Sequence, residues 1–211
     1  MRALIIIVAA LLCSCSSQGN RYVIEGTTAK QSGYYYLLDG YNLVDSAKIE
    51  NGHYRFEGEI DPAMPVRNIA SASNTHDFMN KIRFAQVILE GGTITVTEQD
   101  NSATGGLAIR GTKGNDAMYN FAREAMLIQE AIAESFYPEN RKKLIEKYEQ
   151  MLNKTIRKNL DNFASVNLLI ASQNRYTVEQ RRDFINRMSP QIRQTRTVQA
   201  LIEELNTNNN E

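Results

Sequence analysis

The sequence predicts an α+β fold, in which an antiparallel β-sandwich of about eight short strands precedes a region of four to five helices. Two observations predict this order. Between residues 22 and 112, short apolar segments alternate with turn residues, a spacing typical of a sandwich rather than a parallel sheet. After Gly114, apolar residues recur at steps of three and four, which is the helical period.

The first residues have the order of a secretory signal. Arg2 precedes the apolar run Ala3–Leu12, which is too short for a membrane-spanning helix because such a helix needs roughly 20 residues. Leu12, Ser14 and Cys15 resemble the lipobox of bacterial lipoproteins, with a small residue directly before the cysteine. We therefore expect a cleaved signal peptide over residues 1–14 and lipidation at Cys15, in preference to Cys13.

Residues 15–21 form a short tether between the lipid and the folded body. The chain from Cys15 to Tyr22 spans at most about 25 Å, so the body is expected to lie close to its membrane leaflet. Ser16 and Ser17 carry no acidic cluster, which by analogy with bacterial lipoproteins favours an outer-membrane anchor facing the periplasm. The lipid makes the membrane an expected partner.

The composition excludes several classes of function. The chain has 24 basic and 24 acidic residues, and loss of Arg2 leaves a mature chain with a formal charge of −1. No basic face stands out, so no nucleic-acid partner is expected. Cys13 leaves with the signal and Cys15 carries the lipid, which excludes disulfides, thiol catalysis and cysteine metal sites. We expect no cofactor.

The expected strands are separated by turn residues, of which Asn51-Gly52 is the most specific. This pair predicts a type I′ hairpin, because both central positions need a positive φ. The hairpin register pairs Ile49 with Tyr54 on the buried face, and Ala47 with Phe56. The eight strands are expected at Tyr22–Glu25, Gly33–Leu38, Val44–Ile49, His53–Glu57, Val66–Ser71, Phe84–Leu89, Thr93–Thr97 and Leu107–Arg110.

Gly91-Gly92 predicts a second hairpin of the same kind. Its register pairs Leu89 with Ile94 on the buried face, and Val87 with Val96. The series of short strands and turns predicts a β domain over residues 22–112.

The helical domain is expected over residues 113–205. Two apolar stripes joined by a short connection at Pro138 predict an antiparallel helix pair. A short helix follows over Val166–Ala171, and Thr177 with Gln180 forms a capping box. The first stripe is Met118, Phe121, Ala125, Ile128, Ile132 and Phe136, and the second is Leu144, Tyr148, Leu152, Ile156 and Leu160.

Two features mark the end of the chain. Ser189 before Pro190 predicts a further helix start, and Val198, Leu201 and Leu205 predict a last amphipathic helix. Residues 206–211 form a polar tail that is expected to be disordered.

Several stretches follow one another in a characteristic order. They are Tyr22–Gly26, Tyr36–Gly40, Asp45–Ala47, Asn51–Phe56, Ile88–Gly92 and Gly111–Asn115. This series resembles the domain of unknown function that precedes thioredoxin-like, peroxiredoxin-related (AhpC/TSA-type) thiol-disulfide interchange domains in envelope lipoproteins of Gram-negative bacteria. The stretch from Asn159 to Leu169, followed by Met188–Pro190, is similar to the helical connector of those proteins.

The resemblance implies a fold and a compartment but no chemistry. In the longer relatives a thioredoxin-like domain with a Cys-x-x-Cys pair follows the connector, whereas this sequence stops at Glu211. Redox activity is therefore not carried over to any residue here.

Three other patterns resemble functional motifs, but a structural explanation is stronger for each. Gly106, Gly111 and Lys113 resemble a phosphate-binding loop, but Leu107–Arg110 between the glycines is typical of a strand, so nucleotide binding is not expected. Scattered carboxylates such as Glu90 and Glu98 give no fixed glycosidase spacing. The third pattern has the residue types of a hydrolytic triad but the composition of a solvated loop; it consists of Ser71, Ser73, His76 and Asp77.

Asp45-Ser46-Ala47 resembles the acceptor motif of general protein O-glycosylation in some envelope bacteria. Ser46 is therefore a possible O-glycosylation site. The alternative is an ordinary strand residue within a hairpin. His53 and His76 are the only histidines and lack carboxylates at ligand spacing, so no metal site is expected.

The sequence predicts a non-catalytic, membrane-anchored interaction or binding module that is not an enzyme and that binds another envelope protein. One alternative is an accessory subunit that docks on a thioredoxin-like thiol-disulfide oxidoreductase. Others are an unrecognised hydrolase and a glycan-binding lipoprotein, for which exposed aromatic rings among Tyr34, Tyr35 and Tyr41 would be needed.

Overall fold

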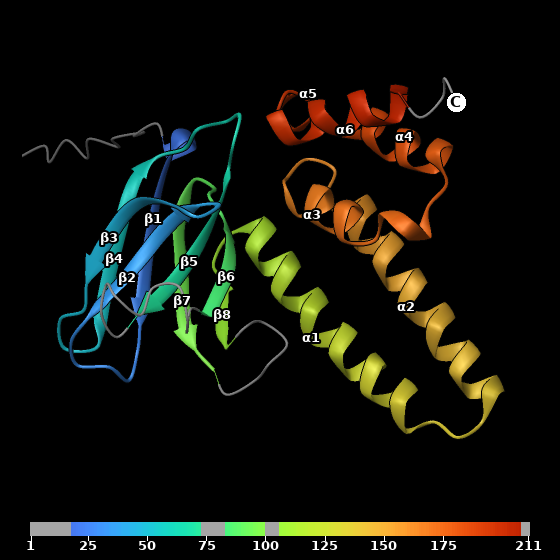
Figure 1. The fold of residues 1–211 in the computed structure, drawn as a ribbon, viewed down its shortest axis with the longest axis horizontal. Helices are drawn as coiled ribbons and strands as arrows, with labels where there is room; N and C mark the ends of the chain where they lie inside the picture. The colour runs from blue at the N-terminus through green and yellow to red at the C-terminus, as the bar shows by residue number, and fades with distance from the viewer. Residues whose placement is uncertain (1–17, 73–82, 100–105, 208–211) are drawn as a thin grey trace, which may run out of the picture.

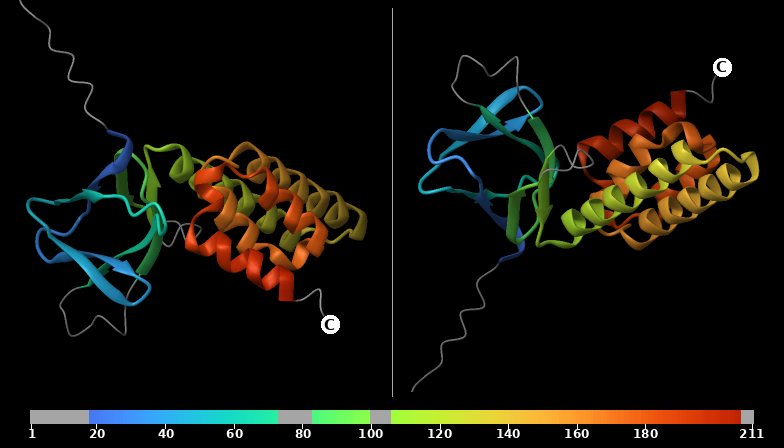
Figure 2. Two further views of the ribbon diagram at one scale, coloured as in Figure 1. Left: turned by 90° about the horizontal axis from the view of Figure 1, so that it is seen from above. Right: turned by 90° about the horizontal axis from the view of Figure 1, so that it is seen from below.

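The computed structural model describes residues 18–72, 83–99 and 106–207 and has a β body on one side and a helical body on the other (Figures 1 and 2). Cys15, Ser73, His76 and Asp77 lie outside the described residues. A 3₁₀ turn, η1 (Gln18–Asn20), precedes the eight strands, and all eight expected strands are present. They are β1 (Arg21–Thr27), β2 (Tyr34–Asp39), β3 (Asn42–Lys48), β4 (His53–Glu59), β5 (Val66–Ala72), β6 (Arg83–Ile88), β7 (Gly92–Glu98) and β8 (Leu107–Arg110).

The strands form two four-stranded sheets, as a sandwich requires. The first sheet has the order β4-β1-β7-β8 and the second has the order β3-β2-β5-β6. All pairs are antiparallel except β1 with β7, which is parallel. Alternate residues of both sheets point inward and form one apolar core, which includes Ile24, Leu37, Phe56, Ile69 and Ile94.

The Asn51-Gly52 turn forms as predicted, with φ values of 52° and 77° at its two residues. The prediction that β3 and β4 pair as a hairpin was wrong. Glu50 pairs with His53 next to the turn, but beyond this pair the two strands belong to different sheets. The turn is thus a corner of the sandwich. The expected buried residues, Ile49, Tyr54, Ala47 and Phe56, nevertheless lie together in the core.

The prediction of a second hairpin at Gly91-Gly92 was also wrong. β6 pairs with β5 in the second sheet, whereas β7 lies between β1 and β8 in the first sheet. The connection therefore crosses from one sheet to the other. Alternation of apolar residues identifies the buried face of each strand but not its neighbour, and the expected buried residues, Val87, Leu89, Ile94 and Val96, do lie in the core.

Six α-helices occur among the described residues, against the four to five expected. The antiparallel pair and the capping box at Thr177 are confirmed, and Ser189 caps the four-residue α5. The helices are α1 (Lys113–Glu134), α2 (Pro138–Lys158), α3 (Ala164–Ala171), α4 (Val178–Arg187), α5 (Pro190–Arg193) and α6 (Arg196–Thr207), with a 3₁₀ turn, η3 (Gln173–Arg175), between α3 and α4.

Phe136 does not belong to the apolar stripe of α1. The helix ends at Glu134, and Tyr137 before Pro138 is extended, because a proline disfavours helical backbone in the preceding residue. Phe136 therefore lies in the connection, where it is 93% exposed. At the other end of the chain, α6 continues to Thr207, two residues past the expected limit, and residues 208–211 lie outside the description.

The two bodies meet at the second sheet. Ile88 of β6 and Val66 of β5 belong to the apolar core of the helices rather than to the sandwich core. Asn115 of α1 is 2% exposed, donates to the Ile88 carbonyl at 2.7 Å and accepts from the Ile88 N–H at 3.0 Å. In the described part of the chain, no helix is both long and apolar enough to span a membrane.

Candidate functional site

The residues that resemble a phosphate-binding loop have structural roles. Leu107–Arg110 is strand β8, as predicted, and Gly111 turns the chain with a φ of 97°. The Gly114 N–H at the start of α1 donates to the Glu90 carboxylate at 2.8 Å, and Lys113 pairs with Asp161. This helix terminus therefore already binds a carboxylate of its own chain.

The carboxylates Glu90 and Glu98 do not form a glycosidase pair. Glu90 precedes β7 and Glu98 ends it, so the two are separated by roughly 20 Å at the rise of a strand. Glycosidase carboxylates lie within about 10 Å of each other. Of the triad ingredients, only Ser71 is described, and its Oγ accepts from Lys30 Nζ at 3.1 Å.

Two stacked tyrosines close one end of the sandwich. The rings of Tyr35 and Tyr54 lie 3.8 Å apart, and the Tyr35 hydroxyl donates to Glu98 Oε1 at 2.8 Å. Burial, followed by the hydrogen bond to Glu98, raises the pKa of Tyr35 to about 12. Burial also raises the pKa of Tyr54, whose hydroxyl has no hydrogen-bond partner among the described residues.

Glu98 remains a carboxylate at this end of the core. Burial alone would raise its pKa, but hydrogen bonds from Tyr35, Thr28 and the Ala29 N–H, with the charge of Lys30, lower its pKa below the usual value. Glu98 therefore has its hydrogen-bond donors and a positive charge within this cluster. The cluster is best explained as a structural polar network at the end of the apolar core.

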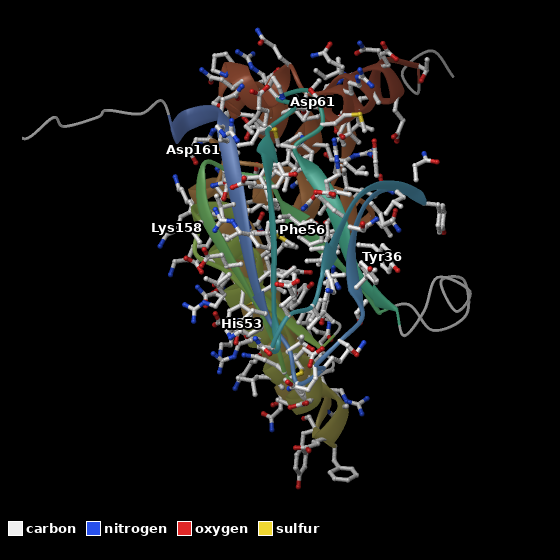
Figure 3. All side chains as sticks on the ribbon, turned by 90° about the vertical axis from the view of Figure 1, so that its left-hand side faces the viewer. Tyr36, His53, Phe56, Asp61, Lys158 and Asp161 are labelled. Atoms are coloured by element: carbon white, nitrogen blue, oxygen red, sulfur yellow. The ribbon has the colours of Figure 1, made fainter. Side chains whose placement is uncertain are left out.

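The outer face of the first sheet has an open depression of about 840 Å³. Its charged groups pair with each other, since Arg55 lies 2.8 Å from Glu25 and Lys48 lies 3.6 Å from Glu50. His53 lies at one end of the β body, far from Asp61 and Asp161 (Figure 3). Within the described ranges, no group of three His, Cys, Asp or Glu side chains is placed to hold a metal.

The three tyrosines considered for glycan binding do not form one platform. Tyr35 is buried in the core, whereas Tyr34 is 44% and Tyr41 82% exposed. Tyr34 begins β2 and Tyr41 follows its end, so their rings belong to opposite ends of the strand. A sandwich-face glycan platform of these three rings is therefore not formed.

Strand β3 has an open edge. It pairs only with β2 among the described strands, and its first five residues, 42–46, are all exposed. Leu43 and Val44 are 58% and 50% exposed, and they lie where the register of β3 with β2 shifts. An unpaired edge with apolar side chains is a template for another strand. Sequence reasoning missed this site, although two adjacent apolar residues in an alternating strand signal that one of them faces away from the core.

Ser46, the possible O-glycosylation site, lies on this edge and is exposed. Its N–H donates to Asp45 Oδ1 at 2.7 Å instead of to β2, so the Ser46 backbone faces the open side of the strand. Val44 lies at an irregularity of the strand, because the register with β2 shifts from Leu37 with Asp45 to Leu38 with Leu43.

The comparisons with known proteins concern mainly the β body. Residues 22–118 match the model of a family described as "Domain of unknown function (DUF4369)". The segment is thus similar to DUF4369 domains. It contains all eight strands and the first residues of α1, which confirms the expected resemblance for this part of the chain. Residues 119–211 lie beyond the match, and their similarity to a connector stays a prediction.

No curated protein matches this sequence. A solved structure similar to part of the chain is the solution structure of the CBM25-2 of the β/α-amylase from Paenibacillus polymyxa, with 15% identity and a TM-score of 0.32 over 44% of this chain and 95% of that chain. At this TM-score, the likeness supports no conclusion about fold or function.

Proposed function

We propose that the protein is a lipid-anchored envelope lipoprotein that binds a partner protein without catalysis, by accepting an extended partner segment along β3. The observation that carries this proposal is the run of five exposed residues on an unpaired edge strand. Such edges bind extended segments through backbone hydrogen bonds, and side-chain contacts provide specificity. Leu43 and Val44 offer exposed apolar contacts beside the added strand.

The test places a photo-reactive residue at Leu43 and cross-links the lipoprotein in cells. Ser46→Pro removes a backbone N–H that faces the open side, whereas Ser46→Ala keeps this N–H. If the partner pairs as a strand, Ser46→Pro lowers the cross-linked product at least tenfold and Ser46→Ala changes it much less. A photo-reactive residue at Leu127, exposed on α1, is the matched control and is expected to capture a different set or nothing.

Equal yields for the proline and alanine variants would contradict strand addition. The identity of the partner separates two versions of the proposal. A Cys-x-x-Cys protein would make this chain an accessory of a thioredoxin-like oxidoreductase, a role that the DUF4369 match favours through the family resemblance described above. A partner without such a pair would make it a scaffold.

The anchor is tested at Cys15. Without the thiol no acyl chain can be attached, so Cys15→Ser is expected to move the protein from the membrane fraction to the soluble fraction or to leave its signal peptide uncleaved. Cys13→Ser is the matched control and should leave both processing and membrane association unchanged. A Cys15→Ser variant that stays in the membrane fraction with its signal peptide cleaved would refute lipidation at this residue.

A further inference from the structure

The large exposed apolar side chains of the described residues fall into two groups. One group belongs to the β body and includes Leu43 and Val44 of the open edge. The other belongs to the antiparallel pair of α1 and α2 and consists of Leu127, Phe136, Tyr137 and Ile145. Leu127 lies seven residues before the last residue of α1, and Ile145 lies seven residues after the first residue of α2. Each is therefore roughly 10 Å from the connection that joins the two helices.

The connection between α1 and α2 is the most exposed part of this second group. Phe136 is 93% and Tyr137 70% exposed. The connection lies at the end of the helix pair that is farthest from the β body (Figures 1 and 2). Exposed apolar patches mark interaction sites, and here two aromatic rings stand at a protruding end. We call this end, residues 134–138, the hairpin tip.

The backbone of the hairpin tip is bonded within the chain. The Ser135 carbonyl accepts a hydrogen bond from Arg141 Nε at 2.8 Å. The Tyr137 carbonyl accepts from the N–H groups of Asn140 and Arg141, both at 3.1 Å. It also accepts from the Ser135 hydroxyl at 3.3 Å. A polar backbone group that leaves water needs such partners, so these bonds lower the cost of placing the tip in an apolar environment.

The charges around the hairpin tip cancel. Residues 130–147 contain four acidic side chains, Glu130, Glu134, Glu139 and Glu146, and four basic ones, Arg141, Lys142, Lys143 and Lys147. Net attraction to a charged surface would therefore contribute little, and burial of the two rings would drive binding. Aromatic rings beside long basic side chains, whose apolar stems can be buried while the charge stays in water, are typical of the membrane interface.

We propose that the hairpin tip inserts Phe136 and Tyr137 into the interface of a lipid bilayer. The inference rests on the proposed function in one respect, because the lipid at Cys15 would hold the chain within reach of a membrane. The tether leads to η1 on the β body, whereas the hairpin tip lies at the far end of the helices (Figure 1). Contact at both places would lay the molecule along the bilayer. The tip is separate from the β3 edge.

The test uses a single tryptophan as a reporter, because the sequence contains none. The purified mature protein with Phe136→Trp is reconstituted into vesicles of phosphatidylcholine whose acyl chains are brominated, since bromine quenches a tryptophan close to the hydrocarbon. We expect at least a twofold loss of fluorescence relative to vesicles without bromine, at low and high salt and with or without phosphatidylglycerol. Asn120→Trp, exposed on α1 roughly 20 Å from the end of the helix, is the matched control and should keep its fluorescence.

A second pair of variants separates insertion of the tip from mere proximity to the bilayer. In the Phe136→Trp background, Tyr137→Asp places a carboxylate at the tip, which disfavours entry into an apolar environment. This variant should recover at least half of the lost fluorescence, whereas Tyr137→Phe should be quenched as before. Tyr137 is exposed, so neither change is expected to disturb the fold.

The proposal is overturned if brominated lipid does not quench Phe136→Trp, if quenching requires phosphatidylglycerol, or if Tyr137→Asp is quenched as strongly as Tyr137→Phe. A blue shift of the Phe136→Trp emission that grows with protein concentration before vesicles are added would also overturn it, by assigning the tip to a second copy of the chain. Failure of the lipid anchor is detected separately, as an intact mass without lipid. The unlipidated protein is then mixed with the same vesicles, and the same quenching is required.

Discussion

Individual residues at the closed end of the sandwich show how a polar group is held at the edge of an apolar core. The Glu98 carboxylate accepts hydrogen bonds from the Tyr35 hydroxyl and from the Ala29 N–H, at 2.8 and 3.1 Å. Hydrogen bonds to a charged acceptor stabilise its ionised form, which is why the pKa of Glu98 is lowered despite partial burial. The stability of the fold should therefore depend on the ionisation of this residue.

The first prediction concerns acid sensitivity. Because the pKa of folded Glu98 is lowered, its stabilising effect is present above the usual pKa of a glutamate and is lost as the pH falls through the folded value. Between pH 7 and pH 3, the free energy of unfolding should fall more in wild type than in Glu98→Gln, by about 1 kcal/mol or less because the carboxyl is largely exposed. Urea denaturation at each pH measures this difference, and parallel profiles would contradict it.

A second prediction at this scale concerns Ser46. The O-glycosylation hypothesis predicts an intact mass above that of polypeptide plus lipid, and loss of the excess in Ser46→Ala. Ser32→Ala, which lacks a preceding Asp, should keep it. A native mass equal to polypeptide plus lipid would remove the hypothesis and leave Ser46 as a strand residue. A glycan on Ser46 would also occupy the open edge of β3, so modified and partner-bound forms should be mutually exclusive.

Among the elements, the turn between β3 and β4 determines how much of the β3 edge stays open. It turns the chain from one sheet to the other, so β3 is packed against β4 only near this corner. Ala47 near the corner is buried, and residues 42–46 farther from it are exposed. The geometry of the corner therefore leaves the open edge on which the proposed function depends.

At the scale of this turn, we predict that replacing Gly52 destabilises the fold. It has a φ of 77°, and a Cβ at this position would lie 2.9 Å from the Thr28 carbonyl oxygen. Gly52→Ala combines the strain of a positive φ with a clash against backbone, so we expect a loss of about 2 kcal/mol in the free energy of unfolding. Gly40→Ala, at a φ of 59° in open space, carries only the conformational strain and should lose about 1 kcal/mol. Denaturant titration compares them, and a smaller loss for Gly52 would be inconsistent with the clash.

In the whole molecule, two bodies are joined through few polar contacts and one shared apolar surface. Asn115 is the central polar contact, because its amide bonds both backbone groups of Ile88 at the surface where β6 meets the helices. Its Nδ2 also donates to Thr112 at 2.7 Å. The relative position of the two bodies depends on this junction.

Asn115→Ala is expected to destabilise the protein by about 2 to 3 kcal/mol, since it leaves both Ile88 backbone groups unpaired in a buried place. Asn120→Ala, on the exposed side of the same helix, should change stability by less than about 0.5 kcal/mol. Thermal and urea denaturation measure both variants. A neutral Asn115→Ala variant would mean that water replaces the amide at the junction.

Local patterns in the sequence determined where the elements lie and which faces they bury. The eight strands, the positive φ values at Asn51-Gly52, the capping box at Thr177 and the antiparallel helix pair all depend on contacts between residues close in sequence. The inward residues Ile49, Phe56, Ile94 and Val96 followed from alternation alone. The DUF4369 resemblance likewise rested on the order of short stretches.

Only the tertiary structure decided which strands are neighbours and which surfaces stay open. The parallel pairing of β1 with β7, the crossing between sheets after β6, and the parting of β3 from β4 all join or separate segments far apart in sequence. Alternation has the same period whichever sheet a strand joins, so it carries no information on pairing. The open edge of β3 results from that pairing, and for this reason this candidate site was not visible before the sheets were assembled.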